Sequence, residues 1–175
     1  MKFEEHGDAD ITLIGSGVQI LPDRWFFTEA FEWPSKKMLI DLINTHQKSG
    51  VILLSGDVHF TQFYHMNCQS LTGYNLTEMT TSGLTHHVNM FAKVADRVMD
   101  MVTPLFWNAS ELVMDFNFGL FRVKRVSNDI EVTLQVRDDR NNVRLARTLS
   151  LKKDMTYKKV ITRYSKMCNA IHSQN

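Results

Sequence analysis

The segment from Gly56 to His59 holds the residue types best suited to chemistry, a carboxylate and an imidazole two positions apart. On extended backbone, residues at this spacing project to the same side. A carboxylate oxygen and an imidazole nitrogen together suit several divalent and trivalent metals. Asp57 and His59 could therefore bind one or two metal ions. The commoner use of such a triplet is an Asx turn, in which Asp57 caps a loop and His59 is exposed.

A second polar cluster runs from Thr80 to His87 and combines hydroxyl groups, a glycine and two adjacent histidines. These side chains could line an anion pocket or add a metal ligand. Adjacent residues of a strand point to opposite sides, so we expect only one of the two histidines to enter a site. Our candidate is His86, catalytic together with His59. The alternative is a helix N-terminus capped by Thr85, and the two uses are compatible because such a terminus also attracts phosphate.

The elements that must position these clusters begin with a β–α–β unit over residues 11–56. Ile11 to Ile14 is typical of a short strand that runs into a turn. Pro34 opens a helix near residues 35–48, and Gly50 is expected at its C-terminal stop. One buried stripe of this helix is expected to hold Met38, Leu39, Leu42 and Ile43.

A continuous apolar run from Val51 to Leu54 is typical of a strand covered on both faces. Asp57 and His59 would then follow a strand end, where polar groups collect around ligands in layered α/β proteins. Residues 74–79 predict another strand and residues 88–101 a helix.

The last third of the chain changes character and predicts a succession of strands. These strands are expected at residues 111–114, 118–123, 130–136 and 145–151. Turn residues at Asn128 and Asp129, and again from Asp139 to Asn142, separate the later strands and indicate an antiparallel meander. Residues 155–172 are expected to form a terminal helix.

The composition, with 43% hydrophobic and 22% charged residues, is that of an ordinary globular protein. The 20 basic and 19 acidic side chains leave a formal net charge of +1, so no basic excess is available for binding nucleic acid. The longest apolar runs are strand-sized, and we expect no transmembrane segment in this chain. Cys68 and Cys168 are too few for a disulfide framework and form no CxxC metal pair.

Several of these segments occur in an order that carries a resemblance to a known family. They are Gly15 to Gln19, Trp33 to Ser35, Gly50 to Phe60 and Glu78 to His86. Together they look like the C-terminal half of the PhoD-like alkaline phosphatases, within the calcineurin-like metallophosphoesterases. Residues 117–119 and 136–138 resemble that family's closing strands. The resemblance covers residues 9–152 of a single, partial domain over residues 1–175, with residues 153–175 as a C-terminal helical tail.

The resemblance implies an α/β fold, the C-terminal part of an α/β/β/α sandwich with a mixed sheet and an antiparallel meander. It also implies hydrolysis of phosphate mono- or diesters by metal-activated water. Asp57 and His59 carry over from the family's motif as metal ligands. Iron and calcium are the ions that the family implies, with zinc or manganese as alternatives. Relatives of this kind are often secreted or membrane-associated, and Asn75 and Asn108 begin glycosylation acceptor triplets.

One departure from the family pattern limits this interpretation. The family draws most of its metal ligands from an N-terminal half with a GNHD-type motif, which does not occur here. Two ligands are fewer than the three that catalytic sites use. We therefore expect a missing N-terminal half to supply the other ligands, and residues 1–175 alone to be inactive.

Two further interpretations stay open. The first is a non-catalytic, truncated paralogue that serves in binding or assembly. The second is a secreted carbohydrate-binding module, which rests on the β-rich last third and leaves the segment from Val51 to His59 unexplained.

Overall fold

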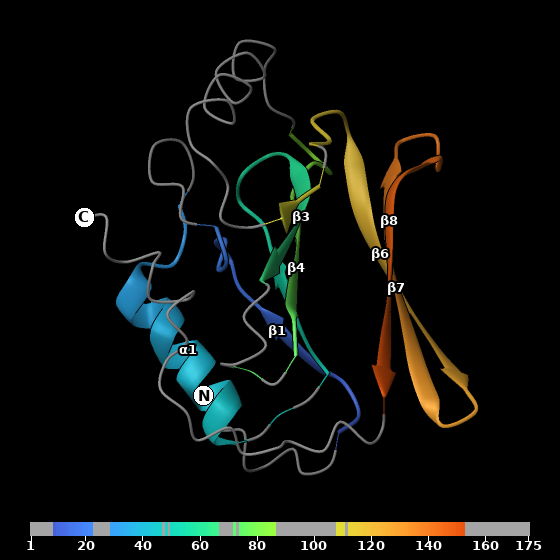
Figure 1. Ribbon diagram of the computed structural model, residues 1–175. Helices are drawn as coiled ribbons and strands as arrows, with labels where there is room; N and C mark the ends of the chain where they lie inside the picture. The colour runs from blue at the N-terminus through green and yellow to red at the C-terminus, as the bar shows by residue number, and fades with distance from the viewer. Residues whose placement is uncertain are drawn as a thin grey trace.

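A computed structural model of the chain describes residues 9–22, 29–46, 48, 50–66, 72, 74–86, 108–110 and 112–152. Within this part, one helix covers one face of a five-stranded sheet, and a three-stranded sheet covers the other face (Figure 1). The elements are β1 (Thr12–Gly15), α1 (Trp33–Thr45), β2 (Val51–Ser55), β3 (Thr61–Met66), β4 (Leu76–Thr81), β5 (Asn108–Ala109), β6 (Asn117–Val126), β7 (Asp129–Asp138) and β8 (Val143–Lys152).

The expected β–α–β unit is confirmed, because β1 and β2 are parallel neighbours in register from Thr12 and Val51 onward. The crossover between them contains α1, which begins at Trp33 with a proline in its first turn. The helix ends at Thr45, before the residue expected to stop it. Gly50 instead has a φ of 65° just before β2. An added Cβ there would lie 2.3 Å from the backbone oxygen of Asp10, so this glycine serves a close approach between two chain segments.

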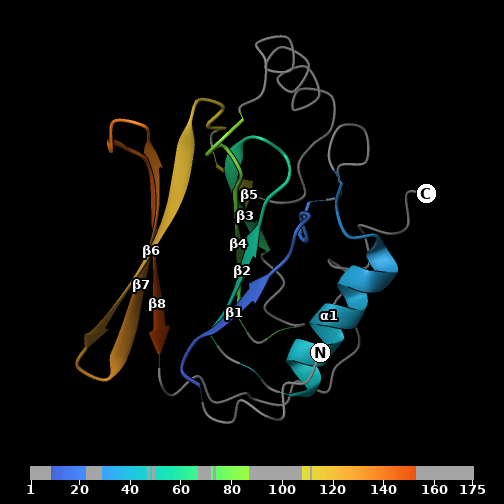
Figure 2. The same ribbon diagram turned by 180° about the vertical axis from the view of Figure 1, so that it is seen from behind.

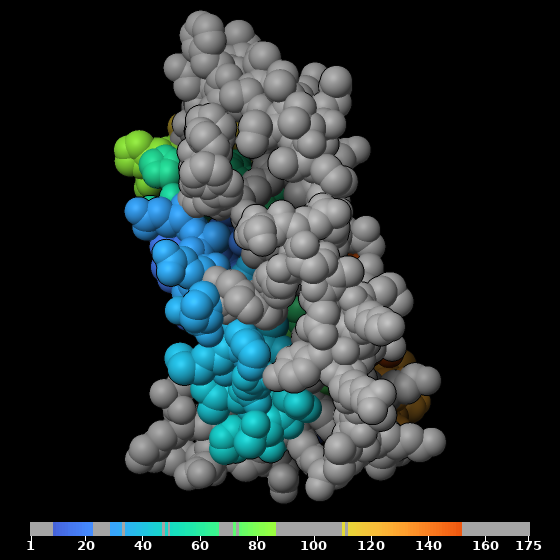
Figure 3. Space-filling model, turned by 60° about the vertical axis from the view of Figure 1, so that its left-hand side comes forward, coloured from blue at the N-terminus to red at the C-terminus, as the bar shows by residue number. Residues whose placement is uncertain are grey.

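The buried stripe of α1 differs from the expected one. Met38 is 64% exposed, whereas Lys36 and Ile40 are buried beside Leu39 and Ile43. Positions 36, 39, 40 and 43 follow the spacing of one helix face, so the helical period was correct. The prediction that included Met38 was wrong, because Lys36 takes a place on the buried face and Met38 lies on the exposed side of the helix. The opposite face of α1 reaches the molecular surface (Figure 3).

The five-stranded sheet has the order β1-β2-β4-β3-β5 and is mixed. Strands β1, β2 and β4 run parallel, whereas β3 is antiparallel to β4 and to β5. Residues 61–66, which form β3, were not predicted as a strand. Of the strand expected at residues 111–114, the described part shows an isolated bridge between Val113 and Thr61.

The antiparallel meander is confirmed as a three-stranded sheet in the order β6-β7-β8. Strands β6 and β7 pair from Asn117 opposite Asp138 to Val126 opposite Asp129. In β7 the buried residues alternate with less buried ones, as expected for a strand with one face on a core. The expected α/β class with a mixed sheet and a meander is therefore present, and the described part is mostly strand.

Two apolar clusters hold the layers together. The first lies between α1 and the five-stranded sheet and includes Ile43, Leu53 and Tyr64. The second lies between the two sheets and includes Ile52, Phe63, Met79, Val132, Leu134 and Val136. Figure 2 shows the helix and the meander on opposite sides of the central sheet. Strand β2 is covered on both faces, as its continuous apolar run indicated.

Several expectations lie outside the described residues: the helix at 88–101, the terminal helix at 155–172, His87, Cys68 and Cys168. Among the residues that the structure describes, no helix has the length and apolarity needed to cross a bilayer.

Candidate functional site

The candidate residues gather at one edge of the five-stranded sheet. Strands β1, β2 and β4 are parallel, so their carboxyl ends at Gly15, Ser55 and Thr81 lie at the same edge. Strand β3 is antiparallel to them and begins at that edge with Thr61. Because β4 lies between β2 and β3, the connection over residues 56–60 must cross the end of β4. The strand order thus brings the loop with His59 against the loop that comes after β4.

Contacts between these two loops place His59 beside His86. Their ring centroids are 5.6 Å apart, in an edge-to-face arrangement with an interplanar angle of 62°. The backbone N–H of His59 donates a hydrogen bond to the Ser82 hydroxyl at 3.2 Å. The ring of His86 also lies within hydrogen-bond distance of the Thr85 hydroxyl, at 3.0 Å. Both histidines are exposed, so a ligand from solvent can reach their rings.

The backbone of the first loop differs from the extended form that the sequence suggested. Asp57 has a φ of 63° and His59 a φ of 59°, both in the left-handed region. The premise that Asp57 and His59 lie on extended backbone was therefore wrong. Gly56, which directly precedes Asp57, does not have a positive φ. Left-handed residues other than glycine cost free energy and cluster at functional sites, which makes this loop notable on structural grounds.

The donor set of the site fits part of a metal coordination shell. Asp57 and His59 supply an oxygen and a nitrogen donor of the kinds that iron, zinc and manganese accept, and His86 adds a second imidazole. Within the described ranges, however, no group of three histidine, cysteine or acidic side chains is close enough to hold an ion. Asp57 is exposed and does not complete such a group with the two histidines. The residues fit as contributors to a site, not as a whole one.

Beneath the site lies a buried polar network that sequence reasoning missed. Glu78, in the middle of β4, is fully buried, and its carboxylate accepts hydrogen bonds from the backbone N–H groups of Ile20 (2.9 Å) and Leu21 (2.6 Å). The Ser55 hydroxyl donates to the same carboxylate. Burial raises the pKa of Glu78, while the hydrogen bonds from Ser55, Leu21 and Ile20 and the charge of Lys36 act in the opposite direction.

Lys36 completes this network from the helix side. Its ammonium group is fully buried and donates to the backbone oxygens of Leu21 (2.9 Å) and Pro22 (3.3 Å). Glu78 and Lys36 therefore hold the N–H and C=O groups of the segment that comes after β1. A weak signal was present in the sequence, because Lys36 stands three and four positions before Leu39 and Ile40 on a helical face.

No family model, curated protein or solved structure matches the chain. The resemblance to PhoD-like phosphatases therefore rests on the order of its motifs.

Proposed function

We propose that this chain is the C-terminal part of a metal-dependent phosphoesterase, in which Asp57 and His59 are metal ligands and His86 acts beside them. The observation that supports the proposal most is the contact between His59 and His86 at 5.6 Å. These two residues come from separate motifs of the resemblance, and each motif continues from a parallel strand of one sheet. The carboxyl ends of parallel strands are where ligands bind in α/β proteins.

Three features of the described residues support the proposal. The exposed imidazoles can hold or donate a proton at the ester oxygens. The Ser82 hydroxyl accepts a hydrogen bond from the backbone N–H of His59 and so links the two loops that carry the histidines. The left-handed backbone at Asp57 and His59 turns both residues out of the strand direction. A bound metal would lower the pKa of its water and stabilise developing charge on phosphorus.

The proposal includes a contribution from outside the described residues. A catalytic metal ion generally needs three protein ligands, and the described part offers no such group. We infer that the remaining ligands come from an N-terminal half of the metallophosphoesterase type. The helix, mixed sheet and meander would then form part of an α/β/β/α sandwich, with the outer helical layer over the meander supplied by that half. Iron and calcium are the ions proposed from the resemblance.

The metal-binding step can be tested on residues 1–175 with zinc as the probe, by isothermal titration. We expect measurable binding that His59→Ala and His86→Ala each weaken. His46→Ala is the matched control, because His46 comes directly after the end of α1, at the opposite edge of the sheet from the loops. A chain that binds no zinc would contradict the metal site and favour the alternative, a non-catalytic binding or assembly domain.

Hydrolysis needs its own test, with p-nitrophenyl phosphate and its diester and with iron and calcium added. We expect no appreciable turnover from residues 1–175, because the described residues offer only part of a ligand set. Turnover that Asp57→Ala abolishes would show that this chain carries a full site, and it would overturn the requirement for another half.

A further inference from the structure

Asn117 is a buried residue at the start of β6 that bonds to Thr61, directly after the first loop of the candidate site, and to Gly83 in the second loop. It is only 2% exposed. Its side-chain oxygen accepts a hydrogen bond from the hydroxyl of Thr61, the first residue of β3. Its backbone N–H donates to the oxygen of Gly83 at 3.0 Å. One residue of the second sheet is thus bonded to two segments of the first sheet.

These two segments are the ones that carry the histidines. Thr61 stands two positions after His59, and Gly83 stands between Ser82 and His86. The Asn117 amide packs directly on the Gly83 backbone, where an added Cβ would lie 2.2 Å from the amide nitrogen. Gly83 is therefore needed for this contact, since any larger residue would push the amide away.

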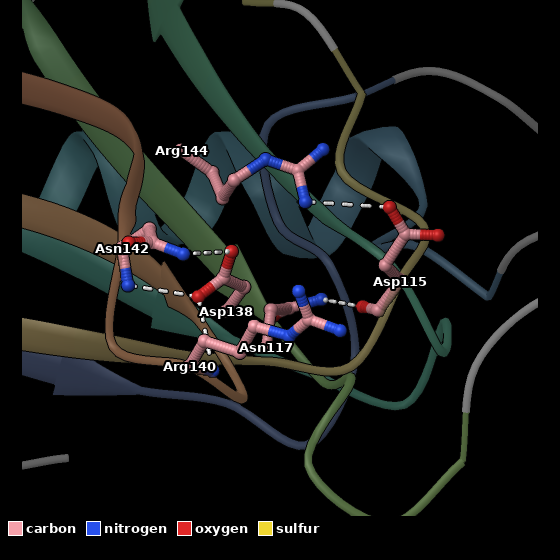
Figure 4. Close-up of polar contacts among 6 residues, drawn as sticks. All are labelled: Asp115, Asn117, Asp138, Arg140, Asn142 and Arg144. Atoms are coloured by element: carbon pink, nitrogen blue, oxygen red, sulfur yellow. Dashed lines mark hydrogen bonds and ion pairs between the residues drawn. The ribbon is translucent and has the colours of Figure 1, made fainter.

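The side-chain amide of Asn117 also bonds to the segment just before β6. Its nitrogen donates to the backbone oxygen of Asp115 at 2.7 Å, and the Asp115 carboxylate pairs with Arg144 of β8 at 3.3 Å (Figure 4). The pair with Arg144 is largely exposed and contributes little by itself. The hydrogen bond between Thr61 and Asn117 is buried, and losing it leaves a polar group without a partner.

We propose that Asn117 is a positioning residue, which sets the separation of His59 and His86 by bonding to Thr61, directly after the first loop, and to Gly83 in the second. This inference rests on the proposed function for its purpose, because two metal-site residues need a fixed spacing. It adds that the meander, which carries neither histidine, controls the geometry of the site. Partners that orient metal ligands typically change metal affinity by about 10–100-fold when they are removed.

The decisive measurement is the change that His86→Ala causes in the ring signals of His59, followed by NMR in the metal-free chain. We call this change the ring coupling. In the otherwise unchanged chain, His86→Ala should shift the ring signals of His59, because the rings are in edge-to-face contact. Asn117→Ala removes the side-chain bond to Thr61 and keeps the backbone bond to Gly83, and in that background we expect the shift to become much smaller. Asn117→Ala alone, with both histidines present, should lower zinc affinity by about 10–100-fold. Asn142→Ala is the matched control, since Asn142 is hydrogen-bonded to Asp138 in the turn between β7 and β8 (Figure 4).

A second pair of variants keeps the test decisive if Asn117→Ala unfolds the chain. Thr61→Val removes the hydroxyl that donates to Asn117 and retains a β-branched side chain in β3, whereas Thr61→Ser retains the hydroxyl. We expect Thr61→Val to weaken the ring coupling and Thr61→Ser to restore it. Full coupling in folded Asn117→Ala and Thr61→Val would overturn the proposal. A chain that loses coupling in these variants but never binds zinc would retain the positioning role and refute the metal site.

Discussion

The rings of His59 and His86 meet edge to face at 5.6 Å, although each belongs to a different loop. The contact arises because β4 lies between β2 and β3, so the connection that carries His59 crosses the end of β4. Neither residue is on a strand itself, and the position of each depends on the loop backbone. The stability and pH dependence of the elements around them can therefore be tested separately from metal binding.

The left-handed backbone of the first loop predicts a trade-off between stability and binding. His59→Gly should raise the free energy of unfolding, by up to about 1 kcal/mol, because glycine adopts a positive φ without strain. The same variant should lose zinc affinity. Ser127→Gly is the control, since Ser127 has a φ of 56° in the turn between β6 and β7. It should gain stability and keep zinc binding, and urea unfolding with zinc titration measures both. A less stable His59→Gly protein would contradict the strain argument.

Gly50 and Gly15 should respond very differently to the same substitution. Gly50→Ala places a Cβ 2.3 Å from the Asp10 oxygen at a φ of 65°, and we expect it to lower the free energy of unfolding by roughly 2 kcal/mol. Gly15→Ala meets no heavy atom within 4 Å, so its effect should stay within about 0.5 kcal/mol. Chemical denaturation of the two variants provides the comparison. Equal effects would mean that the approach of residue 50 to residue 10 is not maintained in solution.

Glu78 should make stability depend on pH in a defined direction. Burial raises the pKa of this carboxyl in the folded chain. A raised pKa means that the folded state binds the proton more tightly than the unfolded state. The contribution of Glu78 to the free energy of unfolding is therefore largest at pH values below its ordinary pKa, and it falls as pH rises through the pKa of the folded state.

Glu78→Gln isolates this effect, because it removes the titration. The variant should be less stable at pH 4 to 5, by about 1–3 kcal/mol, since its amide nitrogen cannot accept from the loop N–H groups. The difference should shrink at higher pH, as urea unfolding across a pH series would show. A growing difference would mean that the hydrogen bonds and Lys36 outweigh burial.

His65 and Arg147 lie between the two sheets, so removing the charge of Arg147 should change the pKa of His65. His65 shares the face of β3 that buries Phe63, and Arg147 is paired with Leu134 on the inner face of the meander. Burial lowers the pKa of His65, and the charge of Arg147 lowers it further. Neutral His65 therefore contributes to the free energy of unfolding at pH values above its ordinary pKa. This contribution is lost as pH falls through the pKa of the folded state.

Arg147→Met should raise the pKa of His65 toward its ordinary value, measured by titration of the ring signals. Arg144→Met is the matched control, because Arg144 is exposed and pairs with Asp115. An unchanged His65 titration in Arg147→Met would show that burial alone sets this pKa.

Patterns along the chain were sufficient to predict the helix and most strands. The alternation in Asp129–Asp138 and the apolar run in Val51–Ser55 are local features, and both elements formed as expected. The approximate face of α1 could be predicted from the same periodicity. The residues that make up this buried face could not be predicted, because Lys36 is buried where it donates to the carbonyl groups of Leu21 and Pro22. Those partners come from another segment, and periodicity carries no information about them.

The sequence by itself determined that Asp57 and His59 come after a buried strand and that His86 belongs to a second cluster, rich in hydroxyl groups. Only the tertiary structure decided that His59 meets His86, that Asp57 and His59 have left-handed backbone, and that Asn117 bonds to both Thr61 and Gly83. The physical reason is that hydrophobic periodicity is local, whereas strand order depends on packing between distant segments. The placement of β4 between β2 and β3 converts two separate motifs into one candidate site.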